Sequence, residues 1–508
     1  MKKRTMLNFS LLALALIFWS CDDEKDPVEE TNVITVAGIV TEAGSGDPVS
    51  DVTVSSGIAS TTTNGEGAYS LNANKDGILV FKKDGYEDED KNVSNQTKVD
   101  IQLTKIEEVV ETVILSGLTT GDMTLTADKN YEINQKFVVM NGHTVTIEPG
   151  TIIKGREGVG SVASAMIVAR GGQVIAEGTA DQPIIFTSVL DNIQLGEKWG
   201  DNLTENDREK WGGLIILGKA PISAGDGDTE AQIEGIPADE EFGKYGGDDP
   251  EDNSGVFKYI SVRHGGALIG EGNEINGITL GGVGTGTVFE DIEVVATLDD
   301  GVEYFGGTVN SKNIIVTYQG DDAIDLDQNY SGTIENVLVI HGGDDSDKAL
   351  EIDGPEGTAD DGLFTIDKGT FIFTGGNGTG ADLKSKGQGT IKNSVFVGYG
   401  DKATVLIRES FDADNGCANK TDSYDYLVDD EPRLKFDNVE VVTSSTLETV
   451  FSLYANPCAE SLTQEMNDLM IQVLTNSGTK VVSEPSEGVG ADVSVFSWTW
   501  TAQLGLIN

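Results

Sequence analysis

The sequence has little positive charge. Among 508 residues there are 34 Lys or Arg and 85 Asp or Glu, so the formal net charge is −51. Such a charge repels nucleic acid and anionic lipid headgroups, and it attracts cations. We therefore exclude nucleic acid as a partner. The acidity indicates either simple solubility at a cell surface or a specific role for a cation such as calcium.

Histidine and cysteine are also scarce. The three His residues are His143, His264 and His341. None has a partner at metal-ligand spacing and no Ser-His-Asp arrangement is present, so we assign structural roles to all three. Cys417 and Cys458 have no neighbouring His, which disfavours a metal site. In an exported protein they form a possible disulfide, and their distance in the fold decides whether they pair.

Proline and aromatic residues are few, with 11 Pro and 7% Phe, Trp and Tyr, whereas Gly is abundant at 63. Many Val, Ile and Thr residues accompany the glycines. This composition favours a turn-rich all-β protein over a helical one. The length allows one to three domains with a large core.

The one long apolar run, Leu11–Trp19, follows Lys2-Lys3-Arg4 and is too short for a mature transmembrane helix. Residues 1–20 therefore read as a signal peptide. The run ends in Ser20-Cys21 and resembles a bacterial lipobox, which implies cleavage before Cys21 and lipidation of its thiol. The acidic stretch after it resembles the surface-export signal of Bacteroidota lipoproteins. We expect a charged tether over 21–31 and a lipid-anchored protein on the outer membrane, facing the exterior.

Residues 32–104 contain several short strand-like runs. They include a Gly46-Asp-Pro-Val segment, an Asn64-Gly65 pair that predicts a hairpin turn, and a closing Lys83-Asp-Gly-Tyr86. The whole segment resembles the carboxypeptidase regulatory-like domain. The resemblance implies a seven-stranded β-sandwich that acts as a non-catalytic spacer.

Residues 289–353 hold three copies of one pattern, each an apolar strand, a Gly/Asp corner and a second strand with alternating apolar residues. Ile292, Ile314 and Val337 occupy the same place in the three copies, 22 and 23 residues apart. A repeat this short must stack on its neighbours to bury its apolar face. We therefore predict that residues 105–508 form a right-handed parallel β-helix, and that the chain as a whole is an all-β protein.

The alternation within the copies predicts an outward column of acids, Glu303, Asp325 and Glu351, with Asp327 and Asp353 in a second column. Carboxylates stacked in this way repel one another, so a cation, basic neighbours or solvent must compensate. Lys384 is expected to continue the Asp325 column. Paired carboxylates on adjacent coils suit calcium, which takes six to eight oxygen ligands. The predicted ligands are Asp299, Asp300, Asp321, Asp322, Asp325, Asp327, Asp344 and Asp345.

The end of the chain contains one amphipathic helix, predicted over 459–474, and an alternating segment, Phe496–Thr501. Together we expect them to cap the open end of the stack, which otherwise exposes a strand edge. Trp498 and Trp500 are possible ligand-stacking residues.

Three functional readings remain open. Residues 110–508 resemble a family of uncharacterised β-helix lipoproteins, through the phrases of 299–310 and 320–327. That resemblance implies a non-enzymatic binding or accessory component, with a TonB-dependent outer-membrane receptor as partner. Alternatively, Gly320–Asp325 resembles a polygalacturonase motif, as do His341-Gly-Gly and Arg408 more loosely, which implies a hydrolase or lyase for acidic glycans. Capture of a glycan without cleavage is the third reading.

Overall fold

The computed structural model describes residues 32–106, 110–270, 273–343, 346–376, 378–400 and 403–507. The predicted signal peptide, the tether with Cys21, and Asp344 and Asp345 lie outside these ranges. The chain divides into two compact units, residues 1–109 and 110–508, which are described separately. No helix among the described residues is long and apolar enough to cross a membrane.

The first unit is the predicted seven-stranded sandwich. One sheet has the order β4–β1–β7 and the other β3–β2–β5–β6. Alternating apolar residues such as Val36, Val54 and Phe81 are fully buried between the sheets. The strands are β1 (Val33–Glu42), β2 (Thr53–Ser55), β3 (Ser60–Thr62), β4 (Ala68–Asn74), β5 (Ile78–Lys82), β6 (Glu89–Asn92) and β7 (Ile101–Leu103).

The turn at Asn64-Gly65 does not close a hairpin. β3 pairs with β2, whereas β4 pairs with β1 in the other sheet, so this turn carries the chain from one sheet to the other. The predicted turn is confirmed, but the predicted hairpin pairing is wrong. Burial of Tyr69 and Leu71 between the sheets decides which strand β4 joins.

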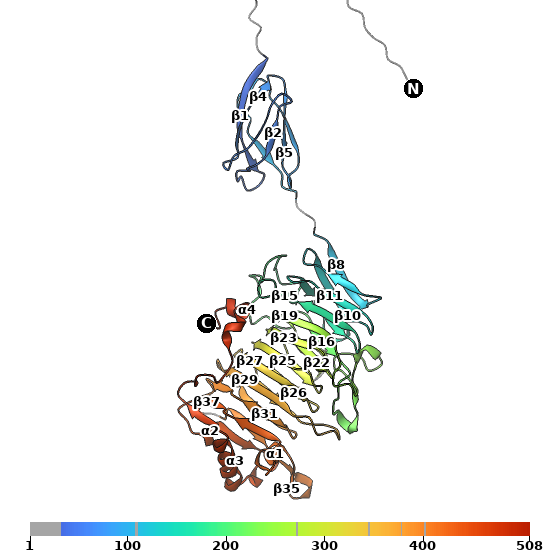
Figure 1. Cartoon of the computed structure of the whole chain (residues 1–508), viewed down its shortest axis with the longest axis vertical. Helices are drawn as coiled ribbons and strands as arrows, with labels where there is room; N and C mark the ends of the chain where they lie inside the picture. The colour runs from blue at the N-terminus through green and yellow to red at the C-terminus, as the bar shows by residue number, and fades with distance from the viewer. Residues whose placement is uncertain are drawn as a thin grey trace, which may run out of the picture. The chain divides into compact units, whose positions relative to one another are not determined.

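The second unit is a parallel β-helix of three faces whose strands belong to one 26-stranded sheet (Figure 1). Five long strands bend across the first and second faces: β19 (Gly255–Arg263), β23 (Val288–Val295), β25 (Ser311–Thr317), β27 (Thr333–Ile340) and β29 (Phe364–Ile372). The first face also contains β9 (Met123–Leu125), β11 (Thr144–Ile147), β14 (Gln173–Glu177), β31 (Gly389–Lys392) and β36 (Leu434–Asp437).

The second face is completed by further strands that pair in parallel along the stack. They are the first parts of β8 (Thr112–Leu118) and β10 (Asn130–Val139), then β12 (Ile152–Gly155), β15 (Ile184–Ser188), β32 (Val395–Val397), β37 (Glu440–Val442) and β39 (Lys480–Val482).

The third face carries the candidate site. After the last parts of β8 and β10 it runs through β13 (Ala165–Val168), β16 (Leu214–Leu217), β22 (Ile278–Gly281), β24 (Val302–Phe305), β26 (Ile324–Asp327), β28 (Lys348–Ile352), β30 (Thr379–Leu383), β33 (Val405–Arg408) and β38 (Phe451–Tyr454).

The predicted register of the three copies is confirmed. Ile292 pairs with Ile314 and Ile314 with Val337 on the second face, and all three point into the fully buried core. On the third face Val302, Ile324 and Leu350 are aligned in the same way. These inward positions are apolar because burial of one side chain from every coil holds the stack together.

A ladder of polar side chains lines the corner between the first and second faces. Asp291, Asn313 and Asn336 each adopt a left-handed conformation there, with φ of 56°, 56° and 63°. The Asn313 amide donates to Asp291 at 2.8 Å, and the Asn336 amide donates to Asn313 at 2.9 Å. Asn and Asp tolerate this conformation better than other side chains, which explains their recurrence at a sharp corner.

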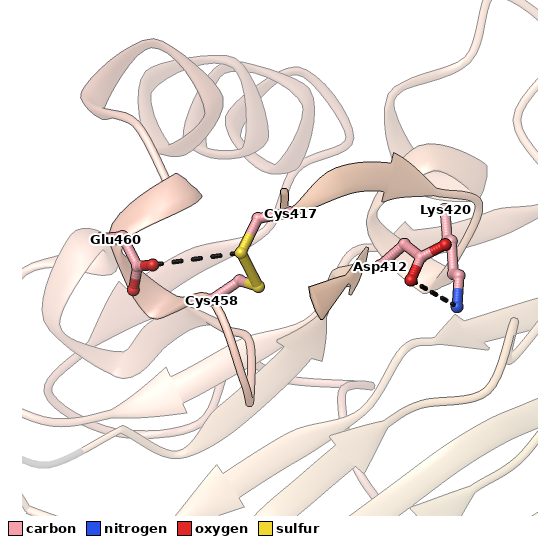
Figure 2. Close-up of a disulfide and its surroundings, with 5 residues drawn as sticks. All are labelled: Asp412, Cys417, Lys420, Cys458 and Glu460. Atoms are coloured by element: carbon pink, nitrogen blue, oxygen red, sulfur yellow. Dashed lines mark hydrogen bonds and ion pairs between the residues drawn. A yellow bond between two sulfur atoms is a disulfide. The ribbon is translucent and has the colours of Figure 1, made fainter. Parts of the chain in front are cut away.

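The C-terminal cap is a helix, as predicted. α3 (Gln464–Asn476) places Met470 and Leu474 on the end of the core, and α1 (Ser423–Val428) packs beside it with Leu427. Cys417 and Cys458 form a disulfide in this region (Figure 2). It joins the hairpin of β34 (Ser410–Asp412) and β35 (Ala418–Lys420) to the turn that precedes α3.

The last residues do not cap the stack, so this prediction was wrong. Instead of a strand, 493–503 forms two short helices, Val493–Phe496 and α4 (Trp500–Gln503), that lie against the outside of the second face, far from α3 (Figure 1). Phe496 packs on outward residues of β25 and β27, namely Ile315, Leu338 and Ile340. We call residues 491–507 the C-terminal strap.

Glu293 fastens the strap to β23. Its side chain is 0% exposed and accepts hydrogen bonds from the backbone N–H groups of Trp500 at 3.1 Å and Thr501 at 2.8 Å. Trp498 and Trp500 are each 5% exposed and pack on Tyr259 and His264, respectively. These tryptophans are therefore covered by protein, which contradicts the ligand-stacking role considered for them.

We predict that Glu293→Ala lowers the free energy of unfolding by about 3 kcal/mol, because buried N–H groups of the strap lose a charged acceptor. Chemical denaturation followed by tryptophan fluorescence measures the loss, and limited proteolysis should cut first near the C-terminus. Glu335→Ala is the control, since this exposed carboxylate forms only weak ion pairs and should cost under about 1 kcal/mol. Equal stability of the two variants would contradict the assigned role.

Candidate functional site

The outward side of the third face changes chemistry along the stack. One column runs through the apolar residues Leu118, Val138, Ile167 and Ile215 and continues through Thr279. Four acids then follow on consecutive coils, which are Glu303, Asp325, Glu351 and Asp382. The predicted acidic column therefore exists, and it is one residue longer than expected.

Lys384 does not belong to that column. β30 places Asp382, rather than Lys384, beside Glu351, so Lys384 falls in the second column after Asp327 and Asp353. The error is two residues, because the coil between Leu350 and Ala381 is longer than the three copies and offers no internal pattern for its alignment. Arg408 follows Lys384 in the second column, where acid gives way to base.

The acidic column is buried, although it points away from the β-helix core. Glu303 and Asp325 are only 7% and 8% exposed. Two insertions cover this region. One is the loop that includes Glu234. The other is the hairpin of β20 (Ala267–Gly270) and β21 (Asn273–Ile275), and Asn276 follows directly after β21. Of the three ways of compensation that the sequence left open, solvent is therefore excluded for Glu303 and Asp325.

Glu234 and Asn276 belong to the candidate site, and the sequence did not predict them. The Asn276 amide nitrogen donates to Glu303 at 2.5 Å, and its amide oxygen accepts from the Asp300 backbone at 3.3 Å. Glu234 lies near both Asn276 and Glu303, close enough for each to affect its pKa. No sequence signal identifies either residue, because each lies in an insertion outside the repeat.

The corner aspartates stack as a second ladder. The Asp322 backbone N–H donates to the Asp300 carboxylate at 2.8 Å, and the Lys348 backbone N–H donates to Asp322 at 2.7 Å. Asp300 and Asp322 are buried, whereas Asp299 is partly exposed and Asp321 is exposed. Asp300 and Asp322, the second aspartates of their Asp-Asp pairs, thus each accept a backbone hydrogen bond from the next coil.

Two lysines neutralise one end of the acidic column. Lys348 forms ion pairs with Asp322 at 3.2 Å and Glu351 at 3.0 Å. Lys384 pairs with Glu351 at 2.9 Å and Asp353 at 3.1 Å. Burial alone would raise the pKa of Glu351, but the two ammonium groups hold that pKa below its ordinary value.

The other end of the column has no such compensation. Within the described ranges, Asp300, Glu303 and Asp325 form no ion pair with Lys or Arg, and Asp325 Oδ1 is buried without a hydrogen-bond partner. Burial and the neighbouring carboxylates raise the pKa of all three well above the ordinary range. Burying an unpaired carboxylate is costly, so a proton or a cation must offset the charge.

Carboxylates at the edge of this cluster titrate near neutrality. Burial, with help from Glu274, raises the pKa of Glu234 to about 7 and that of Asp299 to about 8. Burial and Asp353 raise the pKa of Asp327 to about 8. The cluster can therefore take up or release protons over the pH range in which a divalent cation would compete for the same oxygens.

Four groups of three carboxylates have ligand atoms within 4.8 Å of one another. One is Asp300, Glu303 and Asp325, all buried. The others are Asp299, Asp300 and Asp321; Asp321, Asp322 and Asp347; and Asp322, Asp325 and Glu351. Five of the predicted ligands are thus brought together, while Asp327 lies beside Asp353 and Lys384 and joins none of these groups.

Two of the residues that suggested an enzyme, Arg408 and His341, make contacts away from the carboxylate cluster. Arg408 forms a two-point ion pair with Asp382 and lies 3.9 Å from the ring centre of Tyr454. His341 is fully buried, with its ring against Phe373 and Tyr399. In these positions both side chains hold the protein together.

Comparison with known proteins places the β-helix in a family. No curated protein matches the chain. A family model described as a pectate-lyase-like β-helix domain matches residues 117–501, which is most of the chain and nearly all of the second unit. The protein therefore belongs to the pectate-lyase-like β-helix family.

Proposed function

We propose that the protein is a non-enzymatic, calcium-binding lipoprotein of the outer membrane, and that it acts as a binding or accessory component beside an uptake receptor. The observation that carries the calcium proposal is the group of Asp300, Glu303 and Asp325. These are three buried carboxylates with mutually close oxygens and no basic partner among the described residues.

Calcium suits this donor set better than other common cations. The ligand atoms of the cluster are carboxylate oxygens. A hard cation with a flexible coordination number accepts such a set, whereas zinc prefers nitrogen and sulfur and magnesium demands a near-ideal octahedron. Asp300, Glu303 and Asp325 would hold the ion, which would replace the protons that otherwise neutralise them.

The proposed location rests on the sequence of residues 1–31 and on one structural feature. Cys21 follows an apolar run that resembles a lipobox, and acidic residues come directly after it. The disulfide between Cys417 and Cys458 is typical of proteins that fold in an oxidising compartment. The resemblance of 32–104 to carboxypeptidase regulatory-like domains supports a spacer between the anchor and the β-helix.

The receptor partner is supported by the resemblance to β-helix lipoproteins alone. A TonB-dependent receptor is the partner that this resemblance implies. A glycan remains a further possible ligand. An acidic-glycan hydrolase or lyase is the alternative function, and Glu234 and Asp299 favour it because carboxyls with pKa values near 7 and 8 suit acid-base chemistry. Cleavage of polygalacturonate by the purified chain would favour this alternative.

We predict that calcium binds the purified, chelator-treated chain with a dissociation constant between about 10⁻⁶ and 10⁻⁴ M. At a free concentration about 100 times that constant, calcium should add about 2.7 kcal/mol to the free energy of unfolding. Calorimetric titration and thermal melting measure the two effects.

Asp325→Asn separates loss of the metal from loss of the fold. It should abolish calcium binding, yet in chelator the variant should be at least as stable as the parent, because it removes a buried ionisable group. Asp437→Asn, at an exposed position of β36, is the matched control and should bind calcium normally. Unchanged binding by Asp325→Asn would overturn the assignment.

The raised pKa values predict an unusual pH dependence. In chelator, Glu234 and Asp299 keep their protons in the folded chain up to about pH 7 and 8, whereas an unfolded carboxyl ionises at about 4. The folded state then binds more protons over this window, so its stability falls as pH rises from about 4 to about 8. The melting temperature in chelator should decrease from about pH 4 to about pH 8. Calcium should make this decrease smaller, because it replaces the protons at the carboxylates. A rising trend in chelator would refute this.

The anchor has its own test. Cys21→Ser should move the chain from the membrane fraction to the soluble fraction of a bacterial host and should prevent incorporation of a labelled fatty acid, since one acylated cysteine carries the anchor. Cys417→Ser is the matched control and should remain membrane-bound and labelled. Retention of Cys21→Ser on the membrane would exclude lipidation at this residue.

A further inference from the structure

A basic corner lies on the third face, in the coils that precede the carboxylate cluster of Asp300, Glu303 and Asp325. Asn141, Arg170 and Lys219 each come two residues after the end of a strand, namely β10, β13 and β16. These strands pair in parallel on successive coils, so the three side chains rise from neighbouring levels of one corner. The ends of parallel strands are a common place for ligands.

Gly171 brings two of these side chains together. A Cβ atom on this residue would lie 2.4 Å from the Asn141 amide oxygen and 3.0 Å from the Lys219 ammonium nitrogen. Its φ of +80° is also in the region that favours glycine. Both head groups therefore lie over the bare backbone of Gly171, and a larger residue there would displace them.

The corner is the floor of a cavity of about 250 Å³. The apolar part of its wall consists of Met140, Ala169 and Phe242. Phe242 belongs to a short helix, Glu241–Gly243, in the same large insertion that supplies Glu234 to the carboxylate cluster. A polar floor and an apolar wall indicate a ligand with a charged end and an apolar body.

The charges around the cavity are unequal. Arg170 donates to Glu230 at 2.5 Å and to the Gly246 carbonyl at 2.9 Å, which fixes its guanidinium. Glu241 is paired with Lys244 at 2.8 Å. Lys219 makes no salt bridge with any residue that the structure describes, and the Asp252 carboxylate, on which its charge acts, does not line the cavity.

We propose that this cavity binds an organic acid, whose carboxylate lies between Lys219 and Arg170 and whose apolar body packs on Phe242. A carboxylate matches the two cationic side chains that line the cavity, and charge-assisted hydrogen bonds from Lys and Arg are strong when partly shielded from water. A free acid and the C-terminal residue of a polypeptide share this chemistry. The site goes beyond the proposed calcium function, because none of its lining residues belongs to the carboxylate cluster.

The probes are phenylacetate for a free acid and N-acetylphenylalanine for a C-terminal residue, each titrated into the full chain in the presence of chelator. The matched neutral probes are the corresponding amides. We expect the acids to bind and the amides not to bind. Lys219→Met should weaken binding about tenfold or more, because one charge-assisted contact is lost. Phe242→Ala should also weaken binding, by removing the apolar wall.

Lys435→Met is the matched control, since this exposed lysine of β36 lies in a distant coil and should leave binding unchanged. Lys219→Arg should retain binding, and thermal melting checks that each variant is folded. Binding of both acids identifies a general carboxylate site, and binding of N-acetylphenylalanine alone identifies a polypeptide terminus. The proposal is overturned if neither acid binds, if the amides bind as well as the acids, or if Lys219→Met binds like the parent. Because these titrations are made in chelator, failure of the acids to bind would not depend on whether the protein binds calcium.

Discussion

Stacking of coils is the constraint on which the rest of this structure depends. Parallel strands lie about 4.8 Å apart, so every side-chain position recurs at that distance from coil to coil. Inside, the repetition is favourable, because apolar residues such as Ile292, Ile314 and Val337 bury one another. Outside, four consecutive acids bring like charges together, and the protein must neutralise each of them.

The outer column shows different ways of neutralising those acids. Lys348 and Lys384 hold Glu351 ionised, and Asp382 forms an ion pair with Arg408. Glu303 and Asp325 form no ion pair with a basic residue that the structure describes, so a raised pKa keeps protons on them unless a cation replaces those protons. The chemistry of the face thus depends on which coil supplies a basic residue, although the backbone is the same throughout.

Segments outside the repeat determine how much of each face is exposed to solvent. The loop that contains Glu234 and Phe242 covers both the carboxylate cluster and the basic corner over Gly171. On the second face the C-terminal strap covers outward Ile315 and Leu338. Excluding water strengthens the electrostatic interactions beneath such a cover and disfavours the ionised form of a carboxyl group. Carboxylates that point away from the core therefore behave as buried groups.

The sequence by itself determined the all-β class, the coil length and the register of the three copies, because inward apolar residues recur with a fixed spacing and only one stacking buries them all. It also placed the acidic column on the outside. Only the tertiary structure decided that Glu234 and Asn276 complete the carboxylate cluster, that Asp382 replaces Lys384 in the column, and that the C-terminal strap returns to Glu293. The physical reason is shared: insertions and long-range returns carry no repeat, so their positions follow from packing across the folded surface, which no local pattern records.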